Sequence, residues 1–466
     1  MKALFFTTIL AISSLVISAQ NFTGSWQGDL NVPAGKLPVV FNIIQNEGKF
    51  TATMDSPNQG VKGIPISSVQ IKDSVLQLTL SSIGASYEGI WKNSTITGTY
   101  KQNGVALPLA LYRLTGETPK PSRPQEPVEP YAYKTENIKF INESAQITLA
   151  GTLTQPRKTG KYPAVILISG SGPQNRDEEI FDHKPFLVLA DHLTRNGIAV
   201  LRYDDRGTGE STGKFENAIT PDFASDVTAA IKYLKTRNEI DQQQIGLIGH
   251  SEGGLIASMI AAKSREVNFI VLLAGPGIPG DDILALQSRL LGKVNGLSDE
   301  ILDKGEVTNR SIYSVLKGNG TSDDMTRELT MILNDVIKDL PDSQQPPADN
   351  RAAAIAQGVK SINTPWNRFF VNFDPATALE KVTCPVLALN GEKDLQVPPK
   401  ENLAAIKKSL EKAGNKNFTI KEMPKLNHLF QESKTGSPSE YKSIEQTFSP
   451  LALSEISDWI LLKTKK

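Results

Sequence analysis

The sequence predicts two folded domains of different class: a small all-β domain, a barrel or a sandwich, followed by a larger α/β domain. The chain has 466 residues, which is more than one ordinary hydrophobic core supports. Residues 20–114 carry short runs of strand-type residues, whereas residues 135–466 alternate apolar runs of strand length with segments of helical periodicity. Short apolar strands that alternate with helices are typical of a parallel sheet covered on both faces.

The composition suits a soluble globular protein. Apolar residues make up 39% of the chain and charged residues 21%. Lys+Arg and Asp+Glu number 50 each, so the formal net charge is zero. This balance gives no indication of a nucleic-acid partner. The chain has a single cysteine, Cys384, and so makes no internal disulfide.

Residues 1–19 have the features of a secretory signal peptide. Lys2 gives a positive start, residues 4–17 are largely apolar, and Ser18 and Ala19 supply small residues before the expected cleavage. The apolar stretch is shorter than the roughly 20 residues of a bilayer span. We therefore expect a secreted or periplasmic protein with no membrane span after cleavage, and an uncleaved N-terminal anchor is the alternative.

Residues 20–114 predict the all-β domain, because they show no helical period of useful length. The strand-type runs include LPVVFNIIQ at 37–45, VQIKDSVLQLTL at 69–80 and ITGTYKQNGVALPLALYRL at 96–114. Turn signals such as Asn-Gly separate the runs. A barrel or sandwich of roughly seven to nine strands fits this pattern.

Residues 115–134 predict a linker. This stretch, TGETPKPSRPQEPVEPYAYK, has five prolines with charged residues between them. Such a composition favours an extended spacer over a packed core. The boundary between the two domains is therefore placed here.

Residues 135–466 predict the α/β domain. A hairpin opens it at 135–155. Strands are then expected at 162–170, 198–204, 244–250, 267–275, 384–391 and 417–423, and helices at 184–197, 221–237, 253–264, 400–414 and 449–464. The alternation stops between about 278 and 375, where helical fragments are plausible and strands are not. An insertion of this size between two strands is expected to cover the strand ends as a cap.

Residues 249–253, GHSEG, form a G-x-S-x-G motif between a predicted strand and a predicted helix. A serine hydroxyl is a poor nucleophile unless a base activates it. Small residues two before and two after Ser251 let strand and helix approach across a tight turn that projects the hydroxyl toward substrate. Ser251 is therefore the candidate nucleophile, and a plain glycine-rich turn is the alternative.

A base for this serine must come from one of four histidines: His183, His192, His250 and His428. The first two lie before or within a predicted helix, and His250 sits inside the motif and points away from Ser251. His428 lies in a loop after the last predicted strand, where its imidazole is able to reach the serine. His428 is therefore the candidate base, and a core histidine is the alternative.

An acid is needed to hold the histidine tautomer, and Asp394 is preferred over Glu392 in the segment LNGEKDLQVPP. Backbone N–H groups are also needed to stabilise an oxyanion. One is expected from Glu252, directly after the nucleophile. The other is expected from ISGSG at 168–172, where Ser171 is preferred and Gly172 is the alternative.

These segments together resemble the α/β-hydrolase superfamily over residues 135–466. YDDRGTGES at 203–211 matches its Asp-x-Arg-Gly-x-Gly-x-Ser turn, and SGSG at 169–172 is similar to its His-Gly-x-Gly oxyanion motif, with Ser replacing His. The chain order Ser251, Asp394, His428 is that of the superfamily triad. GSGPQNRD, GHSEGG and a preceding β domain further resemble a group of secreted or thermophilic esterases that is grouped with serine aminopeptidases.

The resemblance implies an α/β-hydrolase fold with a helical cap insertion, and hydrolysis of carboxylic esters through an acyl-enzyme. Ser251 would attack the ester carbonyl, His428 would carry the proton, and the oxyanion would rest on the N–H groups of Glu252 and Ser171. The expected partner is a small-molecule ester. No metal or organic cofactor is expected, because the sequence has no ligand cluster and no intact dinucleotide fingerprint.

Two features bear on the substrate. An aromatic cluster lies near the end of the insertion: Trp366, Phe369, Phe370 and Phe373. It lines an acyl or aryl pocket in one interpretation and forms the cap core in the other. The Glu252 side chain either binds a substrate amine, which favours a peptidase, or pairs with an arginine such as Arg206 or Arg176.

Three functions remain open from the sequence. The first is a secreted carboxylesterase, and the second is a serine aminopeptidase or other peptidase that uses the same triad. In the third, the β domain captures a glycan or cell-envelope polymer and the hydrolase fold is a relic. The complete triad argues against the third.

Overall fold

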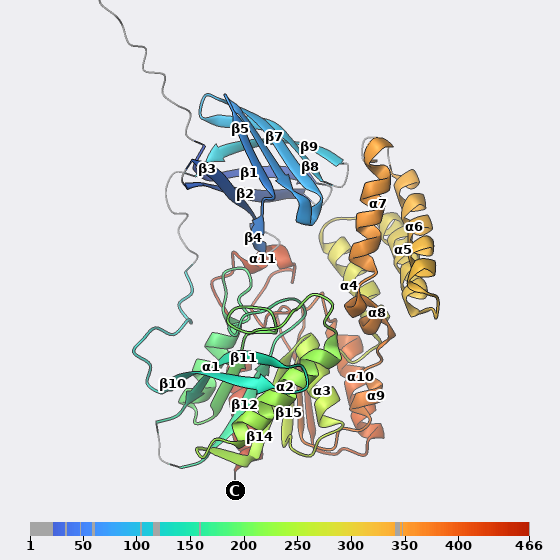
Figure 1. Ribbon diagram of the computed structural model, residues 1–466. Helices are drawn as coiled ribbons and strands as arrows, with labels where there is room; N and C mark the ends of the chain where they lie inside the picture. Colours follow the sequence, from blue (N-terminus) through green and yellow to red (C-terminus); the bar gives the residue numbers. More distant parts are fainter. Residues whose placement is uncertain are drawn as a thin grey trace, which may run out of the picture.

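The computed structural model describes residues 22–32, 35–46, 48–57, 61–102, 105–114, 122–157, 160–340, 345–346 and 348–465. The expected signal peptide and the first part of the linker, residues 115–121, lie outside the described residues. Figure 1 shows the β domain in blue at the top, the α/β domain below it, and the inserted helices in yellow and orange along one side.

The N-terminal domain is one antiparallel sheet in the form of a half-barrel, with strand order β4-β3-β2-β1-β9-β8-β7-β6-β5. Its strands are β1 Gly24–Val32, β2 Gly35–Asn46, β3 Lys49–Ser56, β4 Val61–Pro65, β5 Ser68–Lys72, β6 Val75–Leu80, β7 Ala85–Lys92, β8 Thr95–Gln102 and β9 Val105–Arg113. Alternation sets the two faces: in β6, Leu76, Leu78 and Leu80 are buried while Gln77 and Thr79 are exposed. A 3₁₀ turn, Ser81–Ile83, joins β6 to β7.

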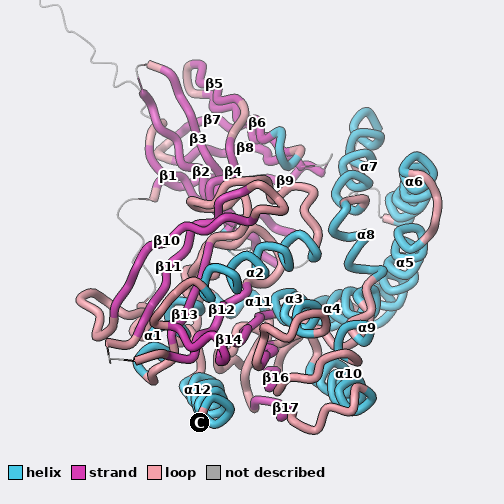
Figure 2. The backbone as a smooth tube through the Cα atoms, turned by 60° about the horizontal axis from the view of Figure 1, so that its bottom comes forward, coloured by secondary structure: helices cyan, strands magenta, loops and turns pink. Residues whose placement is uncertain are grey.

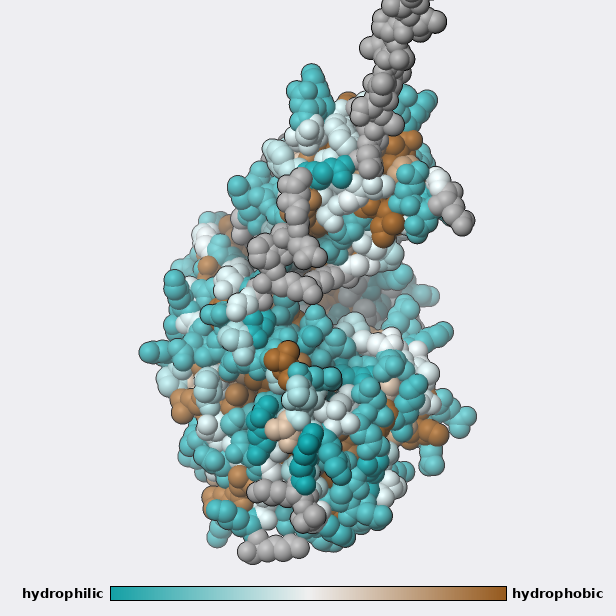
Figure 3. All heavy atoms as spheres, turned by 90° about the vertical axis from the view of Figure 1, so that its left-hand side faces the viewer, coloured by the Kyte–Doolittle hydropathy of each residue, from teal (hydrophilic) through white to brown (hydrophobic). Residues whose placement is uncertain are grey.

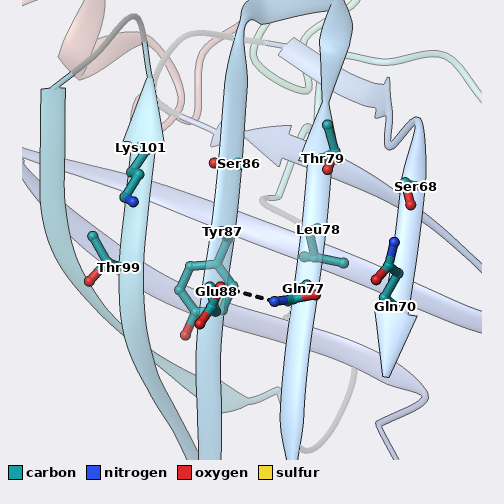
Figure 4. Close-up of a pocket in the computed structure, with 10 residues that line it drawn as sticks. All are labelled: Ser68, Gln70, Gln77, Leu78, Thr79, Ser86, Tyr87, Glu88, Thr99 and Lys101. Atoms are coloured by element: carbon teal, nitrogen blue, oxygen red, sulfur yellow. Dashed lines mark hydrogen bonds between the residues drawn. The ribbon is translucent and has the colours of Figure 1, made fainter. Parts of the chain in front are cut away.

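A polar groove of about 370 Å³ crosses β5 to β8 of this domain (Figure 4). Its lining consists mostly of polar side chains on the face opposite the hydrophobic core, together with the buried Leu78 and Tyr87. Gln70, Gln77, Glu88 and Thr99 are neighbours across the four strands, and Gln77 Nε2 donates to Glu88 Oε2 at 3.0 Å. A glycan or envelope polymer as the ligand of the β domain stays a prediction.

The described part of the linker packs against the α/β domain. The Arg123 guanidinium donates to the carbonyl oxygens of Phe181 and Asp182 on one loop, at 3.3 and 3.0 Å. It also donates to those of Lys442 and Ile444 on a second loop, at 2.9 and 2.7 Å. This part of the proline-rich stretch is therefore bonded to the domain that follows it.

The α/β domain contains a sheet with strand order β10-β11-β13-β12-β14-β15-β16-β17. Its strands are β10 Lys134–Asn142, β11 Ile147–Gln155, β12 Tyr162–Ile168, β13 Ala199–Tyr203, β14 Ile240–His250, β15 Phe269–Leu273, β16 Val386–Gly391 and β17 Phe418–Met423. The pairs β10–β11 and β11–β13 are antiparallel, and the pairs from β13 to β17 are parallel. The expected hairpin and strands are present.

Helices cover both faces of this sheet (Figure 2). One face carries α2 Thr220–Lys235, α3 Glu252–Ala261 and α10 Pro399–Lys412, and the other carries α1 Pro185–Arg195 and α12 Pro450–Thr464. Strand side chains alternate between the two cores, so that Ile166 packs with the first set and Val165 with the second. A short helix, α11 Pro438–Tyr441, precedes α12. The α/β prediction is confirmed.

The insertion between β15 and β16 is helical where the structure describes it. It contains α4 Gly280–Val294, α5 Asp299–Lys317, α6 Ser322–Asp339, α7 Ala348–Ile362, α8 Pro365–Asn372 and α9 Ala376–Leu379. Local signals fix its helices: Thr321 and Asp324 form a reciprocal capping box at the start of α6. Ile312, Leu329 and Val359 belong to a small core of its own, so the predicted helical cap is confirmed.

The outer surface is mainly hydrophilic on the face shown in Figure 3, where hydrophobic residues occur in small separate groups. None of the described helices is long and apolar enough to cross a membrane.

Candidate active site

Ser251 lies in the sharp turn between β14 and α3. Its backbone has φ 53° and ψ −119°, a strained conformation for a residue other than glycine. The flanking glycines are required, because a Cβ on Gly249 would lie 2.0 Å from Gly253 O and a Cβ on Gly253 would lie 2.1 Å from Ile168 O. The G-x-S-x-G motif therefore has the strand–turn–helix geometry of a nucleophile elbow.

His428 and Asp394 are bonded to each other. His428 Nδ1 lies 2.8 Å from Asp394 Oδ2, and both side chains are buried. A carboxylate accepts, so Nδ1 carries the hydrogen and Nε2 keeps a lone pair that is able to take a proton. Asp394 Oδ1 accepts the main-chain N–H of Val397 at 2.9 Å. The alternative acid, Glu392, accepts the main-chain N–H of Lys425 instead.

Ser251 and His428 line one cavity of about 230 Å³, which we call the Ser251 pocket. Its roof comes from the cap and consists of four apolar side chains and one amide: Ile283, Leu284, Trp366, Phe370 and Gln287. Its described lining includes no lysine or arginine. No described hydrogen bond joins Ser251 Oγ to His428, and such contacts in ligand-free sites are often long and tighten with substrate.

The loop after β12 approaches the nucleophile closely. A Cβ on Gly170 would lie 3.2 Å from Ser251 Cβ, so a larger residue at this position would crowd the nucleophile. Ser169, which replaces the histidine of the superfamily motif, donates to Asp205 Oδ1 at 2.9 Å. No described hydrogen bond uses the main-chain N–H of Ser171 or of Glu252, and both residues line the Ser251 pocket. The main-chain N–H groups of Ser171 and Glu252 therefore stay the candidate oxyanion donors.

His250 forms a second buried pair with Glu178. His250 Nδ1 lies 2.9 Å from Glu178 Oε1, and Nε2 lies 2.9 Å from His428 O. A carbonyl only accepts, so Nε2 carries a hydrogen, and the contact with Glu178 needs one more proton. Burial lowers the pKa of His250, but the charge and hydrogen bond of Glu178 outweigh it and raise the pKa above its ordinary value. Glu178 Oε1 also accepts the N–H of Gly170 at 2.9 Å.

The Glu252 side chain is buried and is not paired with an arginine. Burial raises the pKa of its carboxyl, against three hydrogen bonds from Thr220, Trp366 and Ser171. The expected pairing with Arg206 or Arg176 is wrong. These arginines bind carboxylates of their own, at 2.7 Å and 2.6 Å respectively.

The aromatic cluster divides into two stacked pairs. Trp366 and Phe370 stack with ring centroids 4.8 Å apart and line the Ser251 pocket. Phe369 and Phe373 stack at 5.3 Å and pack where the cap meets α3, outside the described lining. Only the first pair is placed to touch a ligand in this pocket.

The other two histidines have structural partners. His183 is buried between Thr447 and Tyr441 O, and burial lowers its pKa to about 4. His192 lies on α1 and bonds Ser457. Within the described residues, no group of three or more His, Cys, Asp or Glu is placed to hold a metal ion.

Three residues at this site escaped sequence reasoning: Glu178, Asp205 and Thr220. Each supports a loop of the site through a side-chain bond to a residue 32 or more positions away. Local periodicity carries no signal for such contacts. Asp205 belongs to the YDDRGTGES turn that was recognised in the sequence. The motif predicted where this turn lies but not that Asp205 accepts a hydrogen bond from Ser169.

A family model described as alpha/beta hydrolase fold matches residues 163–432, which is more than half of the chain. The chain belongs to the α/β hydrolase fold family. The match runs from β12 past His428, so it includes the elbow, the cap and the candidate base.

Similar proteins are known from other organisms. Esterase EstD of Thermotoga maritima is 26% identical over 314 residues, which cover 67% of this chain and 65% of the relative. An uncharacterized protein of Pseudomonas aeruginosa is 24% identical over 57% of this chain and 69% of its own length. Among solved structures, the Pyrococcus furiosus esterase Pf2001 is 16% identical, with 75% of this chain and 99% of that chain covered and a TM-score of 0.43.

Proposed function

We propose that this protein is a serine hydrolase that cleaves carboxylic esters through a Ser251–His428–Asp394 triad. Ser251 Oγ attacks the ester carbonyl carbon while His428 Nε2 takes its proton. The oxyanion accepts hydrogen bonds from the N–H groups of Glu252 and Ser171. The alcohol leaves with the proton from His428, and water then cleaves the acyl-enzyme by the same steps.

One observation carries this proposal: a strained serine elbow and a buried histidine–carboxylate pair open into the same cavity. The backbone strain at Ser251 costs free energy. A turn with only a structural role would not require this strain. Asp394 holds the imidazole with its free nitrogen available. The name of the Thermotoga relative, an esterase, supports the same reaction class.

The charges of the pocket favour an ester over an aminopeptidase substrate. An aminopeptidase needs a carboxylate for the substrate ammonium, and two carboxylates line the Ser251 pocket. Glu252 is occupied by three donors, and Glu178 is paired with His250. The apolar cap side chains and the cavity of about 230 Å³ suit a short, uncharged acyl group. The serine aminopeptidase remains the second candidate because it would use the same triad.

The test compares p-nitrophenyl acetate, butyrate and octanoate with an aminoacyl p-nitroanilide. We expect turnover of the two short esters, with little cleavage of the anilide. Ser251→Ala is expected to lose ester turnover and labelling by a fluorophosphonate, both by about 10³-fold or more. Fast anilide cleavage without ester cleavage would establish the peptidase instead, and an unreactive wild type would favour a relic fold with a binding role.

We also propose that the chain is exported, on the basis of residues 1–19. N-terminal sequencing of the protein recovered from periplasm and medium tests this. A new N-terminus near Gln20 is expected. Full-length protein retained in the cytosol would contradict export.

A further inference from the structure

We propose that the Glu252 carboxylate is a positioning residue that couples seating of the cap to the geometry of the oxyanion hole. This inference rests on the proposed function, because it concerns the two N–H donors assigned above. It links the cap residues that form the roof of the Ser251 pocket to the proposed oxyanion donors, and the reaction itself does not require this link.

Three separate elements converge on the one carboxylate. Glu252 Oε2 accepts Ser171 Oγ at 2.8 Å, from the loop after β12. Oε1 accepts Thr220 Oγ1 at 2.6 Å, from the start of α2. Oε1 also accepts Trp366 Nε1 at 2.8 Å, from α8 of the cap. The side chain is 3% exposed, so water does not replace a lost partner without cost.

The bond to Ser171 braces the oxyanion hole directly. The main-chain N–H of Glu252 is one proposed donor and that of Ser171 is the other. The only described hydrogen bond of the Ser171 side chain is the one to Glu252. A single side chain therefore ties the two donors together across the space that the oxyanion would fill, and donor placement governs this form of stabilisation.

The bond to Trp366 extends the brace to the cap. An indole N–H only donates, so this contact exists only while Glu252 Oε1 faces the cap. Trp366 stacks on Phe370 at 4.8 Å, and both form the roof of the pocket. If the cap were displaced from the pocket, the Glu252 carboxylate would lose this donor and keep only Ser171 and Thr220. All three hydrogen bonds that position the Glu252 side chain therefore form only when α8 of the cap is in contact with it.

The central test is Trp366→Phe, which keeps an aromatic ring for stacking and removes the N–H. We expect kcat for p-nitrophenyl acetate to fall by about tenfold, while KM changes by less than about threefold, because the donors act on the transition state. Trp459→Phe is the matched control. Trp459 lies on α12, and its indole N–H donates to Thr419 of β17 at 3.2 Å. The kcat of Trp459→Phe is expected to stay within about twofold of wild type.

Two variants of Glu252 distinguish two roles of its side chain: holding its three hydrogen-bond partners in place, and supplying a negative charge. Glu252→Gln is expected to keep at least about tenfold more of kcat than Glu252→Ala, because its carbonyl is able to accept from Trp366 and Thr220 while its amide donates to the Ser171 hydroxyl. Glu252→Ala is expected to lose about 100-fold. If the Gln variant loses as much as the Ala variant, the negative charge matters and the brace is refuted.

A double-variant cycle tests the coupling. If Ser171 and Trp366 act through one carboxylate, Ser171→Ala with Trp366→Phe should lower kcat by less than the product of the single effects. Independent effects, or an unchanged kcat in Trp366→Phe, would overturn the proposal even though the wild type hydrolyses esters. A wild type without esterase activity would instead overturn the proposed function. Circular dichroism and the thermal midpoint of each variant confirm that folded proteins are compared.

Discussion

Asp205 gives a prediction about stability that can be worked out from its surroundings. Burial raises the pKa of its carboxyl from 3.8 to about 7, with the negative charges of Glu178 and Asp226 adding to the effect against hydrogen bonds from Gln174 N and Ser169 Oγ. Between these two pKa values the unfolded chain releases the proton and the folded chain keeps it. The contribution of Asp205 to the free energy of unfolding is therefore full below pH 4, falls as the pH rises, and is lost above pH 7.

The size of the effect follows from the pKa difference. A difference of about three is worth roughly 4 kcal/mol, most of it between pH 4.5 and 7.5. Asp205→Asn removes the titratable carboxyl group. It is able to keep both hydrogen bonds of Asp205, since its carbonyl accepts from Gln174 N–H and its amide donates to Ser169 Oγ. The variant should therefore gain stability relative to wild type as the pH rises, by roughly 3 kcal/mol over this interval.

The assay is urea unfolding of wild type and Asp205→Asn at half-unit steps from pH 4.5 to 8, with the transition of the α/β domain fitted at each step. Only the difference between the two proteins is interpreted, because the titration of groups distant from Asp205 cancels in it. Parallel stability curves across the whole interval would refute the reasoning. A gain in the relative stability of Asp205→Asn toward low pH would be opposite in sign to the prediction and would refute the reasoning as well.

Three further predictions follow from single contacts. Asp394→Asn should lower kcat for p-nitrophenyl acetate by about 10³-fold or more, whereas Glu392→Gln, the matched carboxamide change nearby, should leave kcat within about threefold. The reverse pattern would assign the acid to Glu392, and equal losses would contradict the choice between them. Arg123→Ala should lower the free energy of unfolding by about 2 kcal/mol in urea, because it leaves four carbonyl groups of the α/β domain without their charged donor. An unchanged midpoint would show that these linker contacts add nothing. Gly253→Ala should cost about 3 kcal/mol or more, since its Cβ meets a backbone carbonyl, while Gly305→Ala, in open space on α5, should stabilise by up to about 1 kcal/mol in the same thermal scan.

The fold and the main chemical groups were predictable because they leave local signals. The elbow was found from five adjacent residues, and the structure places Ser251 in the same pocket as His428. The partners of Glu252 were not predictable. The negative charge of Glu252 suggested an arginine partner, but the two candidate arginines pair with other carboxylates. Three neutral donors from distant segments converge on the side chain instead. Which donors meet at a buried carboxylate depends on packing between loops, which periodicity does not record.

The proline-rich linker is connected to the candidate active site through the loop that contains Glu178. Glu178 forms one end of a loop that also holds Phe181 and Asp182, and these three residues have φ values of 50°, 52° and 63°. Such backbone conformations cost non-glycine residues energy and persist only where the surroundings hold them. Arg123 binds the carbonyl groups of the last two, and Glu178 in turn holds Gly170 N–H at the oxyanion loop. The linker is thus connected to the candidate active site through one strained loop. A chain cut at the end of the proline-rich stretch would lose this support, so we expect a stable α/β domain to need Arg123, which lies within the segment whose composition alone indicated a spacer.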